Sequence, residues 1–225
     1  MARVEYQQRL EDLRDDVLYM SEVVGERLRK GLDALEQKDN RLAEEVIEGD
    51  GEINRMYLDL EQDCIDLLAL QQPVAGDLRF IAASFKIITD LERIADLATN
   101  LGGYAIDAEK DVFPDVDIQR LGEETIEMLE RAMDAYRSED VDLCYDVARD
   151  DDDLDAMCEA ASELVVRDLL ESDPLDDTET DTEGLMREVS RLLLTIRDIE
   201  RVGDHAVNIA ARTLYMIDNN DELLY

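Results

Sequence analysis

Apolar side chains recur along this chain at intervals of three and four residues over most of its length. This spacing places apolar residues on one face of an α-helix and predicts amphipathic helices that pack through that face. The first stripe consists of Leu10, Leu13, Val17, Met20, Val24, Leu28, Leu32 and Leu35. A second stripe runs from Leu42 to Leu67, and a third follows Pro73. No segment shows the strict alternation of a β-strand, so the pattern predicts an all-α protein.

The second half of the chain repeats this plan. After a non-periodic segment that contains Pro114, we expect three more helices, at about 117–137, 140–171 and 184–218. A repeat of about 100 residues is too long for a solenoid unit, so two fused bundles are the simplest interpretation. We therefore predict six long helices in two tandem three-helix bundles, with the first bundle over 1–108, a linker over 109–116 and the second bundle over 117–225.

The charge of the chain narrows its possible partners. There are 59 acidic and 23 basic side chains among 225 residues, and the formal net charge is −36. Such a field repels phosphate backbones, so we exclude direct binding to nucleic acid. Hydrophobic residues make up 45% of the chain, which favours a packed core over a disordered acidic segment. Because concentrated salt screens self-repulsion, the composition indicates a halophilic protein in a saline cytoplasm, where most isolated acids form a solvated coat.

Further features concern location and redox chemistry. No apolar run approaches the roughly 18 residues of a membrane span, and residues 1–10 lack a signal-peptide core, so we expect a cytoplasmic protein without membrane insertion. The single histidine, His205, is expected to pack at a helix flank. The cysteines lack the spacing of metal-binding pairs and lie among apolar helical positions, so we expect three buried free thiols: Cys64, Cys144 and Cys158.

The third helices of the two halves share a motif of eleven residues. Segment 90–100, Asp-Leu-Glu-Arg-Ile-Ala-Asp-Leu-Ala-Thr-Asn, aligns without gaps with segment 198–208, Asp-Ile-Glu-Arg-Val-Gly-Asp-His-Ala-Val-Asn. Residues spaced by four lie on one face of a helix. The motif therefore stacks oxygen-bearing side chains on one face of each helix: Glu92, Asp96 and Asn100 in the first half, and Glu200, Asp204 and Asn208 in the second.

These stacked carboxylates point to a cation. Two carboxylates spaced by four repel each other, so a helix gains nothing from them unless a cation lies between them. If the second and third helices pack antiparallel, the second helices supply matching oxygens, from Asp50 and Asn54 in the first half and from Asp151 and Asp155 in the second. Ligand sets made only of oxygen favour Mg²⁺, Mn²⁺, Ca²⁺ or iron over zinc. We predict a metal site in each half, with a solvated acidic face as the alternative.

Four separated segments resemble those of the PhoU family. The two motif helices are similar to its paired E-x-x-x-D signatures, and residues 72–79, Gln-Pro-Val-Ala-Gly-Asp-Leu-Arg, resemble its link into the third helix. Residues 46–50, Val-Ile-Glu-Gly-Asp, are similar to its second-helix entry. The resemblance covers about residues 10–218, and the segments follow the order of the family.

The resemblance implies both a structure and a role. It implies two three-helix bundles that frequently form a homodimer and carry multinuclear metal clusters on the bundle surface. It also implies a negative regulator of the phosphate-starvation response, linked to the ATPase of the phosphate ABC transporter and, in bacteria, to a sensor histidine kinase. Asn54 stands where the family prefers Asp, so we favour the second-half ligands Asp151, Asp155, Glu200 and Asp204 over the first-half set.

Two other functions fit parts of the sequence. An all-α, Mg²⁺-dependent nucleoside triphosphate pyrophosphatase of the MazG type uses an E-E-x-x-E pattern, which Glu44, Glu45 and Glu48 match. Its later E-x-x-D pattern fails here, because the corresponding segment ends in Cys64. A helical adaptor without metal is the other alternative. The sequence has no Ser–His–Asp set, Cys–His pair or phosphate-binding glycine loop, so we expect a non-enzymatic regulator.

Overall fold

The computed structural model of the protein describes residues 2–70, 73–108, 116–171 and 182–224. Within these ranges the secondary structure consists of helices without a β-strand, which confirms the all-α prediction. The α-helices are α1 (Ala2–Gln37), α2 (Asn40–Glu48), α3 (Asp50–Leu70), α4 (Ala75–Ile106), α5 (Ile118–Ser138), α6 (Val141–Glu171) and α7 (Thr182–Asp218), followed by the short 3-10 helix η1 (Glu222–Leu224). The predicted linker 109–116 lies almost wholly outside the described residues.

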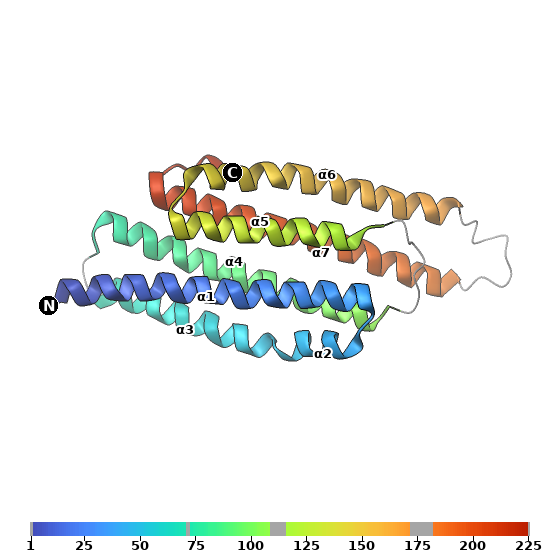
Figure 1. The fold of residues 1–225 in the computed structure, drawn as a ribbon, viewed down its shortest axis with the longest axis horizontal. Helices are drawn as coiled ribbons and strands as arrows, with labels where there is room; N and C mark the ends of the chain where they lie inside the picture. Colours follow the sequence, from blue (N-terminus) through green and yellow to red (C-terminus); the bar gives the residue numbers. More distant parts are fainter. Residues whose placement is uncertain (1, 71–72, 109–115, 172–181, 225) are drawn as a thin grey trace.

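The helices form two halves that lie side by side along the length of the molecule (Figure 1). Helices α1 to α4 make the first half and α5 to α7 the second, which agrees with the prediction of two three-helix bundles. The halves meet where α4 lies along α7 and α1 lies along α5. Helices α4 and α7 run in opposite directions, so equivalent residues of the two halves can face each other across the boundary.

The predicted second helix of the first half is broken into α2 and α3 at Gly49. A Cβ at this position would lie only 2.4 Å from Nη2 of Arg27, so the absent side chain leaves space for a guanidinium. Arg27 is 9% exposed and forms an ion pair with Glu52 at 3.6 Å. Glycine weakens a helix by about 1 kcal/mol relative to alanine. Because a buried arginine also occupies the space beside Gly49, the break falls at this residue.

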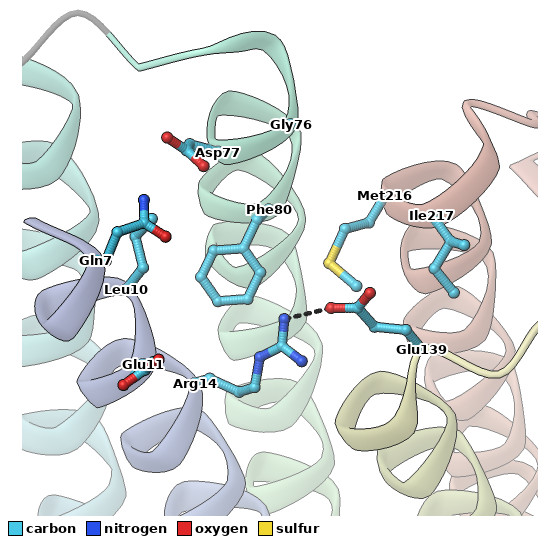
Figure 2. A pocket seen from close by; sticks show the side chains of 10 residues that line it. All are labelled: Gln7, Leu10, Glu11, Arg14, Gly76, Asp77, Phe80, Glu139, Met216 and Ile217. Carbon is cyan, nitrogen blue, oxygen red and sulfur yellow. Dashed lines mark hydrogen bonds and ion pairs between the residues drawn. The ribbon is translucent and has the colours of Figure 1, made fainter. Parts of the chain in front are cut away.

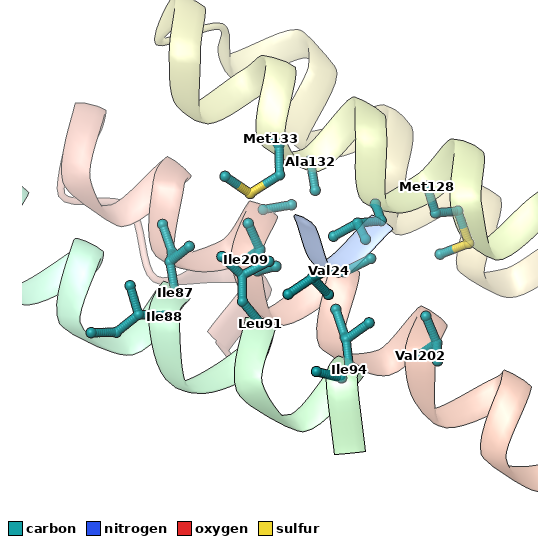
Figure 3. Close-up of a cluster of buried hydrophobic side chains, with 14 of the residues drawn as sticks. Val24, Ile87, Ile88, Leu91, Ile94, Met128, Ala132, Met133, Val202 and Ile209 are labelled. Atoms are coloured by element: carbon teal, nitrogen blue, oxygen red, sulfur yellow. The ribbon is translucent and has the colours of Figure 1, made fainter. Parts of the chain in front are cut away.

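One continuous apolar core joins the two halves (Figure 3). Val24 of α1, Leu91 of α4, Met128 of α5 and Ile209 of α7 all belong to it, and each is almost fully buried. The predicted stripe on α1 is buried as far as Leu32. Since the opposite faces of the helices are charged, no helix in the described ranges is apolar enough over a sufficient length to cross a bilayer.

Substitution of Gly122 tests how tightly the halves pack. A Cβ on Gly122 of α5 would lie 2.4 Å from Cδ2 of Leu32, a core residue of α1 that is 2% exposed. We expect Gly122→Ala to destabilise the protein by about 1–2 kcal/mol, because overpacking outweighs the gain in helix propensity. Gly103→Ala is the matched control, since nothing lies within 4 Å of a Cβ there, and it should be neutral or stabilising.

Urea unfolding at constant salt measures both variants. Equal stabilisation by Gly122→Ala and Gly103→Ala would show that the contact between α1 and α5 is loose.

Candidate functional site

The structure brings the four carboxylates favoured in the second half into one electrostatic neighbourhood. Asp151 and Asp155 lie on α6, and Glu200 and Asp204 lie on α7, which packs along α6. Burial, followed by the charges of Asp155 and Asp204, raises the pKa of Asp151 to about 6. Burial and the same two neighbours also raise the pKa of Glu200. Each group thus resists ionisation because of the others, and an added positive charge would relieve this repulsion.

Asp151 is the most constrained member of this cluster. Its Oδ1 is buried and has no hydrogen-bond partner among the described residues. Gly203 of α7 faces it closely, since a Cβ on Gly203 would lie 3.1 Å from that oxygen and 2.5 Å from Cδ2 of Leu154. The equivalent position in the first-half motif is Ala95. The glycine in the second motif is therefore the signal in the sequence for this close approach.

A cysteine lies behind the carboxylates without joining them as a donor. Burial, and then the charges of Glu200 and Asp155, raise the pKa of Cys158 to about 12. The thiol therefore stays protonated at neutral pH, which leaves only oxygen donors at the cluster. Cys158, Cys64 and Cys144 are all buried free thiols, as predicted.

The first-half residues are arranged differently. Burial and the charge of Asp96 raise the pKa of Glu92, with a smaller contribution from Asp50, so these three acids are near one another. Arg93 forms ion pairs with Glu92 at 3.5 Å and with Asp96 at 3.4 Å, and its charge opposes the rise. Asn54 donates a hydrogen bond from Nδ2 to Oδ2 of Asp50 at 2.7 Å. The first-half acids therefore already have a cation and an amide donor as partners.

The asparagine of the first motif reaches the other half of the molecule. Asn100 donates from Nδ2 to Oδ2 of Asp198 at 3.1 Å, and the Tyr104 hydroxyl donates to the same oxygen at 2.9 Å. Asp198 is 3% exposed and also lies 3.7 Å from Nη1 of Arg201 on its own helix. Because these donors satisfy its carboxylate, the first acid of the second motif is a buried contact between halves.

The second motif makes the reciprocal contact. Asn208 donates from Nδ2 to Oδ1 of Asp90 at 3.4 Å, and Nδ1 of His205 lies 2.9 Å from the same oxygen. The histidine expected at a helix flank thus contacts the first acid of the other half. The Nδ2 groups of Asn208 and Asn100 are both used in this boundary, whereas an amide would bind a cation through its Oδ1.

The carboxylates fit a hard cation in chemistry, although they do not form a ready-made cage. Within the described part of the chain, no three His, Cys, Asp or Glu side chains converge closely enough to hold a metal ion. The second-half cluster nevertheless combines oxygen donors, mutual repulsion and the unpartnered buried Oδ1 of Asp151. These are the properties expected of a site that a divalent cation would draw together.

The family model of the PhoU domain matches residues 17–105 and 118–213, one segment in each half of the fold. This chain belongs to the PhoU family. The PhoU homolog of Pseudomonas aeruginosa, described as a phosphate-specific transport system accessory protein, is 34% identical over 215 residues, which cover 94% of this chain and 85% of that protein.

A second relative and a solved structure agree with this assignment. PhoU homolog 1 of Methanothermobacter thermautotrophicus, described in the same words, is 33% identical and covers 96% of this chain and 95% of its own length. The crystal structure of PhoU from Pseudomonas aeruginosa superposes with a TM-score of 0.85 at 32% identity, over 96% of this chain and all of that one. The PhoU fold therefore extends across both halves of this chain.

The raised pKa of Asp151 predicts how stability depends on pH in this PhoU protein. Its ordinary pKa is near 3.9 when unfolded, so between about pH 4 and pH 6 the folded state binds more protons than the unfolded state. The unfolding free energy contributed by this group is therefore lost as the pH rises through that window. With chelator present, the unfolding free energy of Asp151→Asn should fall by about 1 kcal/mol less than that of the wild type across this pH range. This figure allows for solvent screening of a partly exposed group.

Denaturant unfolding at several pH values measures this slope. Asp153→Asn, an exposed neighbour on α6, is the control and should keep the wild-type slope. Identical slopes for wild type and Asp151→Asn would contradict the placement of Asp151 in a crowded carboxylate cluster.

Proposed function

We propose that this PhoU protein is a non-enzymatic regulator of phosphate uptake and of the phosphate-starvation response, acting in the cytoplasm through contact with other proteins. The observation that carries the proposal is the match of both repeats to the PhoU domain. Relatives that align with 94% or more of the chain are described as accessory proteins of phosphate-specific transport. Its partner is then the ATPase of the phosphate transporter or a phosphate-signalling kinase, and the working form is a homodimer.

The second-half carboxylates supply the proposed metal site. Asp151 and Asp155 of α6 and Glu200 and Asp204 of α7 would hold the cation, which is a hard divalent ion or a multinuclear cluster of such ions. The bound charge would neutralise their mutual repulsion. It would also tie α6 to α7, because the donors come from both helices. The first-half carboxylates would bind more weakly, since Arg93 already lies among them.

The rival function, nucleotide pyrophosphate hydrolysis, receives little support from the site of its motif. Glu44 and Glu45 are exposed on α2, a helix of nine residues. Glu45 forms an ion pair with Arg41 at 2.5 Å. Hydrolysis of nucleoside triphosphates that is lost on substitution of Glu45 or Glu48 would nevertheless favour the enzyme.

Metal content tests the site assignment. Protein purified in high salt should contain metal, measured by elemental analysis after dialysis. Glu200→Gln/Asp204→Asn should lose most of it, because the variant removes half of the proposed donors. Glu92→Gln/Asp96→Asn makes the same charge change in the first half and should lose less. Unchanged metal content in Glu200→Gln/Asp204→Asn would rule out the second-half site.

A pull-down in high salt tests the regulatory role. The tagged protein should capture components of the phosphate transporter or a signalling kinase from cells grown with ample or limiting phosphate. Their absence under both conditions would contradict the role as a regulator that acts by protein contact.

A further inference from the structure

A pocket of about 520 Å³ opens at one end of the molecule, where the two halves meet (Figure 2). Its walls come from α1, α4 and α7 and from the turn between α5 and α6. Met216, which lines it, lies about three helical turns beyond Asp204 along α7. The pocket is therefore a separate feature from the carboxylate cluster of the second half, and its volume lies in the range of ligand-binding cavities.

The floor of the pocket is apolar and well supported. Leu10, Phe80 and Met216 line it, and each side chain is less than 10% exposed. Phe80 stacks on the ring of Tyr136, with 6.1 Å between ring centroids. The hydroxyl of Tyr136 is hydrogen-bonded to that of Ser84 at 2.8 Å. This floor is thus fixed by the core beneath it and offers contact to an apolar group.

Arg14, the one arginine among the described residues of the lining, already has its charge matched. The guanidinium of Arg14 lies 5.0 Å from the centroid of the Phe80 ring and forms an ion pair with Glu139 at 2.5 Å (Figure 2). Glu139 adopts a φ of 55° at the end of α5, a left-handed conformation for which glycine is favoured. Arg14 and Glu139 therefore form an ion pair that links the halves, and the described lining residues include no other basic side chain.

Two other carboxylates of the lining have no such partner. Neither Glu11 of α1 nor Asp77 of α4 forms an ion pair with any residue in the described ranges. Arg79, two residues beyond Asp77, instead donates from Nε to the backbone oxygen of Met216 at 3.4 Å. The nearby Tyr6 hydroxyl is buried without a hydrogen-bond partner, and burial followed by the charge of Asp77 raises its pKa. Asp77 lies in the first turn of α4, where the helix dipole favours a negative charge, but this wall has no cationic side chain paired with Glu11 or Asp77 in the described ranges.

We propose that this pocket receives an arginine or lysine side chain, with an adjacent apolar residue, from a basic segment of a partner protein. The cationic head would lie between Glu11 and Asp77, and the apolar residue would contact Leu10 and Phe80. Phosphate and other anions are disfavoured, because the two unpaired carboxylates would repel them. This inference rests on the proposed function in one respect, namely that the protein acts by contact with other proteins.

The pocket lies at the boundary between the halves, so a segment bound there would contact both of them. Its walls belong to both halves, and the Arg14–Glu139 pair crosses between them. A segment bound there would touch α1 and α4 of one half and α7 of the other. Docking at this point would therefore depend on how the halves are held together, while the metal site lies elsewhere on α7.

Fluorescence anisotropy tests the proposal with a labelled amphipathic peptide that carries arginine and leucine at helical spacing. Wild-type protein should bind it in the high salt used for the pull-down, and more tightly at about 0.15 M salt, where the screening length is about 8 Å. Glu11→Gln/Asp77→Asn should raise Kd at least about tenfold. Asp15→Asn/Glu26→Gln, which removes two exposed charges from α1 outside the pocket, should change it less than about twofold. An equal loss in both variants would show general charge attraction and overturn the proposal.

A second variant blocks the pocket without changing its charge. Gly76 lies in the lining, and nothing lies within 4 Å of a Cβ built there. Gly76→Phe should therefore fold normally, occupy the opening and abolish peptide binding, while Gly51→Phe, at another open position, should not. Circular dichroism confirms folding of each variant. Full binding by Gly76→Phe would overturn the proposal.

The same variants separate this proposal from the proposed function. If Glu11→Gln/Asp77→Asn captures transporter components as well as wild type does, the pocket is not the docking site, although the regulatory role stands. If wild type captures no such component but binds the peptide through Glu11 and Asp77, the regulatory role fails and the pocket stands.

Discussion

The antiparallel contact between α4 and α7 joins the two halves and determines how their motifs meet. Each helix carries an acid and an asparagine ten residues apart, so in opposite directions the acid of one meets the asparagine of the other. A carboxylate as buried as Asp198 is costly unless donors satisfy it, and here Asn100 and Tyr104 do so. Apolar packing gives this contact its strength, and the crossed hydrogen bonds fix its register.

This register also determines where the remaining motif acids point. A step of four residues on an α-helix turns about 40° beyond a full turn, so a residue eight positions on has rotated by about 80°. Glu200 and Asp204 face α6, whereas Asn208 has rotated toward the first half and reaches Asp90. One motif therefore serves two surfaces, the carboxylate cluster within its own half and the contact with the other half.

Much of the fold was predictable from the sequence because helical periodicity is a local property. The helix limits and the inward faces follow from the spacing of apolar residues, and the repeated motif marks the candidate carboxylates. The hydrogen bonds of Asn100 to Asp198 and of Asn208 to Asp90 were not predicted. Each joins α4 to α7, and the spacing of residues within one helix carries no information about the other helix. The break at Gly49 involves Arg27, which comes from a distant part of α1. The single core shared by both halves is equally non-local.

The acids of the two motifs differ in their ion pairs, because the arginine of each motif contacts different carboxylates. Arg93 turns toward Glu92 and Asp96 and supplies the first half with an internal counter-ion. Its counterpart Arg201 lies instead near Asp198 at the boundary. Arg197 partly offsets the repulsion at Glu200, but Asp151 remains among the carboxylates with a buried oxygen that has no partner in the described structure. Such an arrangement costs stability in the absence of a cation. At this cluster the described structure therefore gives a physical reason for binding an external positive charge.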